Sequence, residues 1–164
     1  MTYKKKSWKE KLADNKKFPK ILKFDPKFPC GKSLAKMGAQ KGDSVVLVQP
    51  REVVGIMNHV PKGKLITLKE ICQKLAQNHH TKYCCTLTAG IFIMTAAHAA
   101  EEDKIEGKKE ITPYWRTLKI DGYLNDKYPG GAEAQKKLLE NEGFKISSKG
   151  KKYVVDDYEN YLVK

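Results

Sequence analysis

The sequence is poor in several features that would place it in a specialised class of protein. Its 164 residues include only four cysteines, seven prolines and 9% aromatic residues. So few cysteines in a chain of this length exclude a secreted scaffold held together by disulfides. No segment approaches the roughly 18 consecutive apolar residues of a membrane-spanning helix. The basic start of the chain is not followed by the apolar stretch of a signal peptide, so we expect a soluble protein of the cytoplasm.

Acidic residues are also scarce, above all at the front of the chain. Lys and Arg total 32 against 19 Asp and Glu, which gives a net charge of +13. Residues 1–64 hold 15 Lys and Arg51 against five acidic residues, a net +11, while residues 65–164 are nearly neutral at +2. A hydrophobic fraction of 40% excludes wholesale disorder. The positive charge favours a polyanionic partner, with nucleic acid first and an anionic membrane surface second, although many basic domains use such charge only for solubility.

The cysteines lack the spacing of a metal site. No Cys-x-x-Cys pair is present, and the adjacent Cys84 and Cys85 do not readily bridge each other. His79, His80, Cys84 and Cys85 do place four possible ligands within seven residues, which keeps a metal site as the minor alternative. We expect reduced thiols, at least some of them buried, with no metal and no other cofactor.

Residues 1–49 are expected to form a basic, Lys-rich N-terminal extension of short elements. Ser7-Trp-Lys-Glu10 is a capping box and predicts a short helix over about residues 8–13. Three later prolines keep the backbone extended, since a residue before proline avoids the helical region. The apolar residues between these prolines indicate that the extension lies on the body of the protein. Ser44–Val48 predicts a short strand.

Three helices are predicted at the start of the body, which spans residues 50–146. Pro50 opens the first helix, and the capping box Thr67-Leu-Lys-Glu70 opens the second. The third begins between residues 81 and 88 and ends near Glu101, with the core residues Ile91, Phe92, Ile93 and Met94. Two short helices before an apolar third one are typical of a helix-turn-helix arrangement.

Strands and one further helix are predicted for the rest of the chain. Pro113–Ile120 is strand-like, and Asp121-Gly122 predicts a hairpin turn with a return strand after it. A helix over Ala132–Glu142 is followed by a second hairpin, whose far strand falls in the C-terminal segment, residues 147–164. The expected fold class is α+β, a winged-helix body preceded by the basic N-terminal extension. We expect a monomer.

Several motifs along the body resemble one family. They are Val60-Pro-Lys-Gly-Lys-Leu-Ile-Thr67, Pro113-Tyr-Trp-Arg116, Asp121-Gly122, Gly130-Gly131 and Leu138-Leu-Glu-Asn-Glu142-Gly143. In this order and spacing they are similar to the DNA-binding domain of alkylguanine-DNA alkyltransferases and, more closely, to that of the alkyltransferase-like proteins. The resemblance covers about residues 50–146 and implies double-stranded DNA as the partner. Residues 1–49 match nothing in the family, whose full-length members carry a different N-terminal domain.

The family's acceptor motif is Pro-Cys-His-Arg, in which a cysteine thiolate takes the alkyl group from the damaged base. Here Tyr114 stands at the cysteine position, Trp115 at the histidine position, and Glu142 matches the family's glutamate. A phenol with a pKa of about 10 is a poor acceptor at neutral pH without a base beside it. The resemblance therefore implies no catalytic residue and an aromatic pair that lines a pocket for an extruded, alkylated base.

The DNA contacts implied by the resemblance follow from position in the motifs. The family's third helix enters the minor groove, and the residue that replaces the flipped nucleotide corresponds to Tyr83, with Lys82 as the other candidate. The remaining DNA-binding candidates are Cys84, Cys85, Thr86, Thr67, Tyr114, Trp115 and Arg116. Core packing alone is the alternative role for Tyr114 and Trp115, and bonding to loop carbonyls is the alternative for Arg116.

The function expected from these observations is non-catalytic binding of alkylated-guanine or distorted DNA by base flipping, with a role in DNA repair alongside repair-pathway proteins and no membrane partner. One alternative is a winged-helix DNA binder without lesion preference. Another is an active methylated-DNA–protein-cysteine methyltransferase that uses Cys84 or Cys85 near a helix start. A protein-binding module is the remaining interpretation, and it predicts DNA affinity that barely depends on salt.

Overall fold

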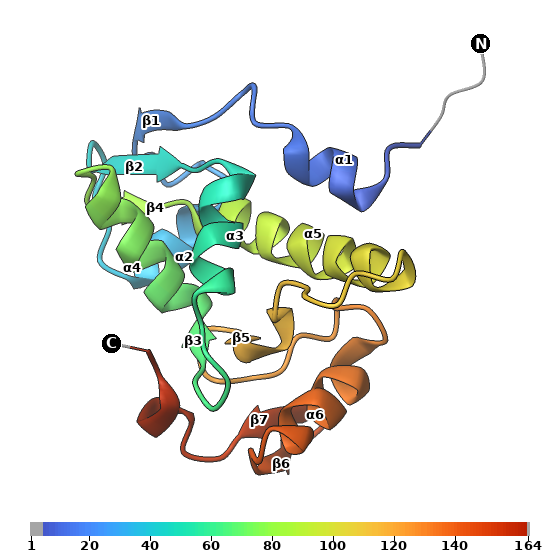
Figure 1. Ribbon diagram of the computed structural model, residues 1–164. Helices are drawn as coiled ribbons and strands as arrows, with labels where there is room; N and C mark the ends of the chain where they lie inside the picture. The colour runs from blue at the N-terminus through green and yellow to red at the C-terminus, as the bar shows by residue number, and fades with distance from the viewer. Residues whose placement is uncertain (1–4, 164) are drawn as a thin grey trace.

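The computed structural model describes residues 5–163, which form helices and small sheets around one long helix (Figure 1). This central helix, α5 (Thr86–Ile105), packs against α1 (Trp8–Ala13), α3 (Pro50–Asn58) and α4 (Leu68–Asn78). Its buried positions are mostly alanines and threonines, whose small side chains let the neighbouring helices approach closely. No helix in the described part of the chain is long and apolar enough to cross a membrane.

The N-terminal extension is docked on α5. The capping box predicted at the start of α1 is present. Trp8 stacks on His98 of α5 with the ring centroids 4.4 Å apart, and the backbone N–H groups of Trp8 and Lys9 donate to the Glu102 carboxylate. The prediction that this extension lies on the body is confirmed.

A three-stranded sheet joins the extension to the body. β1 (Lys20–Lys23) pairs antiparallel with β2 (Ser44–Leu47), which confirms the predicted strand, and β2 pairs parallel with β4 (Tyr83–Cys84). A short helix that the sequence did not predict, α2 (Gly31–Lys36), packs under this sheet through Leu34. The domain boundary expected after residue 49 stays a prediction, although strands from both sides of it share the sheet.

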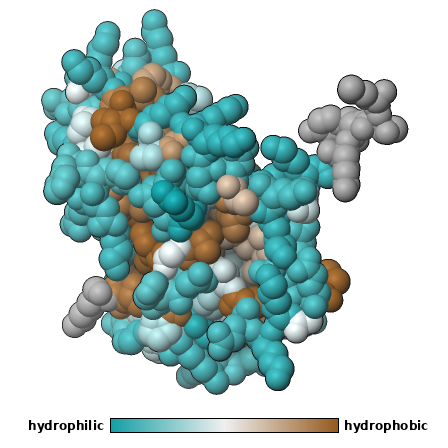
Figure 2. Space-filling model, turned by 45° about the horizontal axis from the view of Figure 1, so that its top comes forward, coloured by the Kyte–Doolittle hydropathy of each residue, from teal (hydrophilic) through white to brown (hydrophobic). Residues whose placement is uncertain are grey.

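The outer strand of this sheet is unusually exposed. All four residues of β1 face solvent at least in part, including Ile21 at 60% and Leu22 at 39% exposure. Figure 2 shows apolar surface at this end of the molecule. Lysines flank the two apolar residues, and charges of this kind on an edge strand discourage pairing with other chains.

The helix starts in the body follow the predicted caps, but α5 ends later than predicted. Pro50 occupies the first turn of α3, and Thr67 with Glu70 forms the capping box of α4. We expected α5 to end near Glu101, whereas it continues for one further turn. No proline or glycine interrupts that turn, and the first left-handed glycine after α5 is Gly107, with φ of +88°.

The strand predicted over Pro113–Ile120 is wrong for most of its length. The acceptor-equivalent motif instead forms a 3-10 turn, η1 (Tyr114–Arg116), followed by the two-residue β5 (Thr117–Leu118). β5 pairs parallel with β3 (Ile66–Thr67), not with a return strand. The side-chain amide of Gln135 donates to the carbonyls of Trp115 and Thr117, so these carbonyls are engaged by a side chain and not by a hairpin partner.

The turn at Asp121-Gly122 is present, but its predicted return strand is not. The Lys119 N–H donates to the Tyr123 carbonyl at 2.9 Å, which closes the turn. Tyr123 then forms an isolated bridge to Val154, so the chain leaves the turn towards the C-terminal hairpin. The hydrophobic contacts of Leu124 with this hairpin explain the change of partner.

The C-terminal elements agree better with the sequence. α6 (Gly131–Asn141) ends before Gly143, which has the left-handed φ of +94° expected of a helix C-cap. The predicted second hairpin is confirmed as β6 (Ile146–Lys149) and β7 (Lys152–Val155). Its tight turn falls at residues 150 and 151, between the two strands. The chain is thus α and β mixed, as expected, and the winged-helix detail stays a prediction.

Candidate nucleic-acid interface

The first turns of α5 present an apolar face to solvent. Leu87 is 45% exposed and Ile91 is 47% exposed. With Gly90 and Met94 they line one side of a hollow of about 520 Å³, which we call the first hollow. The expectation that Ile91 belongs to the core is wrong, because successive helical residues point about 100° apart and four in a row cannot all face inward. Exposed apolar side chains grouped on one helix face make this surface a candidate contact surface.

The opposite side of the first hollow is basic. It comes from the loop after β5 and from β7, and it includes Lys119, Lys127 and Lys152. Lys119 pairs with Asp126 at 3.4 Å. Within residues 5–163, Lys127 and Lys152 form no ion pair closer than 4.0 Å. Their charges are therefore available to a ligand in this hollow.

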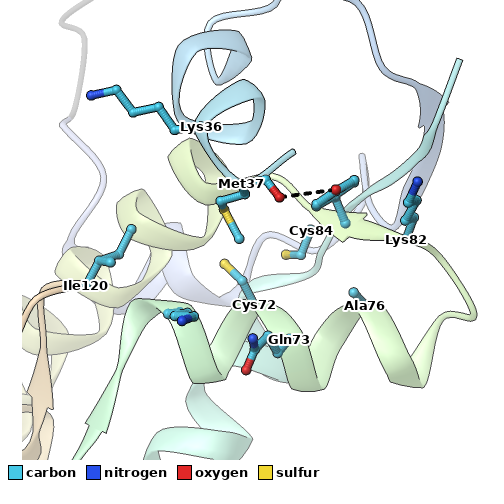
Figure 3. Close-up of a pocket in the computed structure, with 10 residues that line it drawn as sticks. Lys36, Met37, Cys72, Gln73, Ala76, Lys82, Cys84 and Ile120 are labelled. Carbon is cyan, nitrogen blue, oxygen red and sulfur yellow. Dashed lines mark hydrogen bonds between the residues drawn. The ribbon is translucent and has the colours of Figure 1, made fainter. Parts of the chain in front are cut away.

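A second hollow, of about 430 Å³, lies between α2, α4 and β4 (Figure 3). Lys36, Lys69 and Lys82 stand around it, each from a different part of the chain. Ile120 lines both hollows, which makes them neighbours. Asp121 is the single acidic residue among those that line them. We call the two hollows together the basic groove, with the lysines Lys36, Lys69, Lys82, Lys119, Lys127 and Lys152.

Tyr83 and Lys82, the candidates for the residue that replaces a flipped nucleotide, lie at the wall of the second hollow. Tyr83 is half-buried, and its hydroxyl donates to the Met37 carbonyl at 3.4 Å. Lys82 is exposed and lies 3.3 Å from an oxygen of Asp43. Both side chains thus border the groove. That one of them replaces a flipped nucleotide stays a prediction.

The small residues expected at the start of α5 are buried. Cys84, Cys85 and Thr86 are between 2% and 6% exposed. The Cys85 sulfur accepts the Thr88 backbone N–H at 3.5 Å and thus caps α5. Thr67 is equally buried and caps α4. The side chains of Cys85 and Thr67 secure the two helix starts, and the Thr86 hydroxyl donates to the Ser33 hydroxyl, so little of these side chains is left to contact DNA.

The buried thiols are poorly suited to accept an alkyl group. A hydrogen bond with the Cys72 thiol and burial raise the pKa of Cys84. Burial and the neighbouring Cys85 raise the pKa of Cys30 to about 12. Because the thiolate is the nucleophile, both shifts reduce reactivity at neutral pH.

The ligand cluster considered around His79 and His80 does not assemble. Among residues 5–163 no three His, Cys, Asp or Glu side chains are grouped so as to hold a metal ion. His79 instead contacts the Glu52 carboxylate at 2.5 Å, which ties the end of α4 to the start of α3.

Tyr114, at the acceptor-equivalent position, is part of the core. It is 1% exposed, and its hydroxyl donates to the Glu101 carboxylate at 2.7 Å. Its ring packs edge-on against Trp115 and Tyr128, with centroids 5.4 Å and 5.2 Å apart. Burial and the Glu101 carboxylate raise the pKa of Tyr114, which keeps the phenol protonated. Neither Tyr114 nor Trp115 lines a hollow of the basic groove.

Arg116 and Glu142 form a shielded ion pair. Their side chains are 14% and 9% exposed and approach to 2.5 Å, with further bonds from the Arg116 Nε to the same carboxylate. A guanidinium N–H also donates to the Val60 carbonyl at 2.8 Å. Arg116 therefore joins three segments, which is the carbonyl-bonding role that the sequence offered as the alternative to phosphate contact.

The sequence analysis missed most of the groove lysines. Only Lys82 was a candidate, because the motifs that carry the resemblance do not include the other five. Their positions around one surface depend on the packing of α2, α4 and the hairpin, which no local pattern encodes. The run of four apolar residues in α5 was the one available signal of an exposed apolar face.

Comparison with known proteins supports the fold. No protein-family model matches the sequence, and no curated protein matches it. Two solved structures are similar: the S. pombe alkyltransferase-like protein in complex with DNA, with a TM-score of 0.50, and S. pombe Atl1 with damaged DNA containing O6-carboxymethylguanine, with a TM-score of 0.49. In each, the similarity covers 70% of this chain and 94% of that chain at 20% identity. The resemblance to alkyltransferase-like proteins inferred from the motifs is thus confirmed at the level of the fold.

Proposed function

We propose that this protein binds double-stranded DNA across the basic groove. The observation that carries the proposal is the lining of the basic groove: three lysines line the first hollow opposite the exposed apolar face of α5, and three more line the adjoining second hollow. Lysines that surround a shallow groove can neutralise the phosphates of a DNA backbone and provide affinity independent of sequence. The solved structure of an alkyltransferase-like protein with DNA supports the same conclusion, because this chain shares its fold.

The N-terminal extension contributes directly to this surface. Lys36, at the end of α2, lines the second hollow beside Lys69 of α4. Further lysines of the extension are exposed, and none of them has an ion-pair partner within 4.0 Å in the described part of the chain: Lys16, Lys17, Lys20, Lys23, Lys27, Lys32 and Lys41. The extension thus adds phosphate contacts beyond the part of the chain that resembles the family.

The second part of the proposal is that the protein recognises damaged DNA. An alkylated guanine, turned out of the duplex, would be received in the first hollow between Leu87, Ile91 and Met94 on one side and Tyr123 on the other. Apolar and aromatic walls tolerate an added alkyl group and favour stacking with a base. This differs from the role expected for Tyr114 and Trp115, which pack behind the surface.

The protein would bind such a site without repairing it. The burial of Tyr114 and the raised pKa values of Tyr114 and Cys84 argue against alkyl transfer to either residue. Recognition without repair leaves the lesion for other proteins, which is the basis of the expected role in a repair pathway.

Equilibrium binding to two duplexes that differ only in one O6-alkylguanine tests this function. We expect tight binding to both duplexes, a preference for the alkylated one, and a steep fall in affinity with salt. Equal affinities for the two duplexes would contradict the lesion preference. They would favour the alternative, a winged-helix DNA binder without lesion preference. Affinity that is insensitive to salt would contradict DNA binding altogether. The intact mass of the protein recovered from the alkylated duplex should be unchanged, whereas an added alkyl group would identify an active methyltransferase.

A further inference from the structure

The floor of the second hollow brings three sulfur atoms together. Met37 follows α2, Cys72 lies on α4 and Cys84 lies on β4, and Figure 3 shows their sulfur-bearing ends turned toward the same space. Cys72 and Cys84 are each 2% exposed, whereas Met37 is 36% exposed at the mouth of the hollow. The Met37 thioether therefore lies near the surface, and the two thiols are buried beneath it.

The other side chains that line the second hollow limit which metal ions it could bind. None of the residues that line it is His, Asp or Glu. A structural zinc site requires four nitrogen, sulfur or carboxylate ligands, and only three sulfurs are available here. Two thiols and a thioether are soft ligands, which favour Cu(I) over the harder divalent ions.

We propose that Met37, Cys72 and Cys84 form a binding site for a soft monovalent metal ion, Cu(I). On binding, each thiol releases its proton to solvent and coordinates as a thiolate, while the Met37 thioether coordinates without losing a proton. Two thiolates and one Cu(I) carry a net charge of −1. Lys36 and Lys69 also line the hollow and have no ion-pair partner within 4.0 Å among the described residues, so their charges are available to offset it. The sulfur ligands take no part in the proposed DNA binding, although the site shares lysines with the second hollow of the basic groove.

The second buried cysteine pair gives a natural comparison within the same chain. Cys30 and Cys85 are also buried and adjacent, among Phe24, Leu34 and Val45. Neither of them lines the second hollow, and no methionine belongs to their cluster. If thiol pairing alone were sufficient, both pairs would bind Cu(I) equally. The proposal assigns the ion to the pair that has the thioether and the opening.

Titration of the reduced full-length protein with Cu(I), against a chromophoric Cu(I) chelator and without oxygen, tests the proposal. We expect one ion per chain, bound with sulfur ligands in the X-ray absorption spectrum. Cys72→Ser and Cys84→Ser should each abolish this binding, and Cys30→Ser should leave it intact. Loss of an outer-shell partner already costs about 10- to 100-fold in metal affinity, so Met37→Leu should weaken binding by at least about tenfold.

The Met37→Leu variant protects the test from misfolding, because leucine has nearly the same volume and the position is partly exposed. Its circular dichroism and melting temperature should match those of the unmodified protein in the absence of copper. No binding by the unmodified protein in competition with the chelator would overturn the proposal. So would equal loss of binding in Cys30→Ser, or unchanged affinity in a folded Met37→Leu variant.

Discussion

Replacing Lys69, Lys127 and Lys152 together with glutamine is expected to weaken the binding of duplex DNA and to flatten its dependence on salt. These lysines come from α4, the loop after β5 and β7, so they sample both hollows of the basic groove. Each phosphate contact contributes about 0.9 to the slope of log K against log salt concentration, so the loss of three contacts should lower this slope by about 2.7. Fluorescence anisotropy of a labelled duplex at several salt concentrations measures the effect.

A lysine outside the groove provides the matched control. Lys137 is exposed on α6 and lines neither hollow. Lys137→Gln should therefore leave both the affinity and the slope close to those of the unmodified protein. Exposed substitutions of this kind change stability by no more than about 0.5 kcal/mol, so a loss of binding in the triple variant would not reflect unfolding. If the triple variant kept the same slope of log K against log salt concentration, the basic groove would not be part of the DNA interface.

The largest effect on stability is expected at the ion pair of Arg116 and Glu142. Truncation of Arg116 to alanine leaves a shielded carboxylate without its partner and frees the Val60 carbonyl. Breaking one side of a buried pair costs about 3–5 kcal/mol in the free energy of unfolding. Glu142→Ala should have a similar cost, because it strands the guanidinium instead. Urea denaturation of the two variants and of the double variant measures the cost and the coupling.

An exposed pair on the same part of the molecule is the control for this prediction. Lys136 and Glu140 lie one turn apart on α6 at 3.2 Å, with side chains 30% and 44% exposed. An exposed helix pair contributes about 0.3–0.5 kcal/mol, so Lys136→Ala should change stability very little. If Arg116→Ala cost no more than Lys136→Ala, the pair would not hold η1 to the end of α6.

The parts of the fold that could be predicted are those set by neighbours in the sequence. The caps at Ser7 and Thr67 were predicted correctly, because a side chain that bonds to the backbone three residues later needs no tertiary context. The strand expected at Pro113–Ile120 failed for the opposite reason. Its pattern is strand-like, but the amide of Gln135, some 20 residues later, takes its carbonyls.

The residues of the candidate site could likewise be predicted from the sequence only in part. Lysines are easy to count in a sequence, yet the meeting of Lys36 with Lys69 requires α2 to pack beside α4, and α2 was not predicted. Tyr114 was named from the motif, and only the structure shows that its hydroxyl is held by Glu101 in the core. Charge near the front of the chain indicates a polyanionic partner, which stays a prediction, and does not indicate where such a partner would bind.

Because the N-terminal extension is docked on the body, its role in DNA binding should be tested by substitution and not by deletion. Phe24 and Leu34 are buried, so deletion of the extension would remove core residues together with its lysines. Loss of DNA binding after such a deletion would not distinguish lost charge from lost structure. Substitution of single exposed lysines avoids this difficulty, since the backbone and the apolar contacts of the extension are kept.

Hydrogen exchange of the backbone amides, with and without a saturating duplex, measures whether DNA binds in the basic groove. We expect slower exchange with the duplex in the first turns of α5, residues 86–94, and in the loop of residues 119–127, both of which line the basic groove. The helix α6 should exchange at the same rate in both samples. Protection confined to α6, or no protection anywhere, would contradict DNA binding in the basic groove.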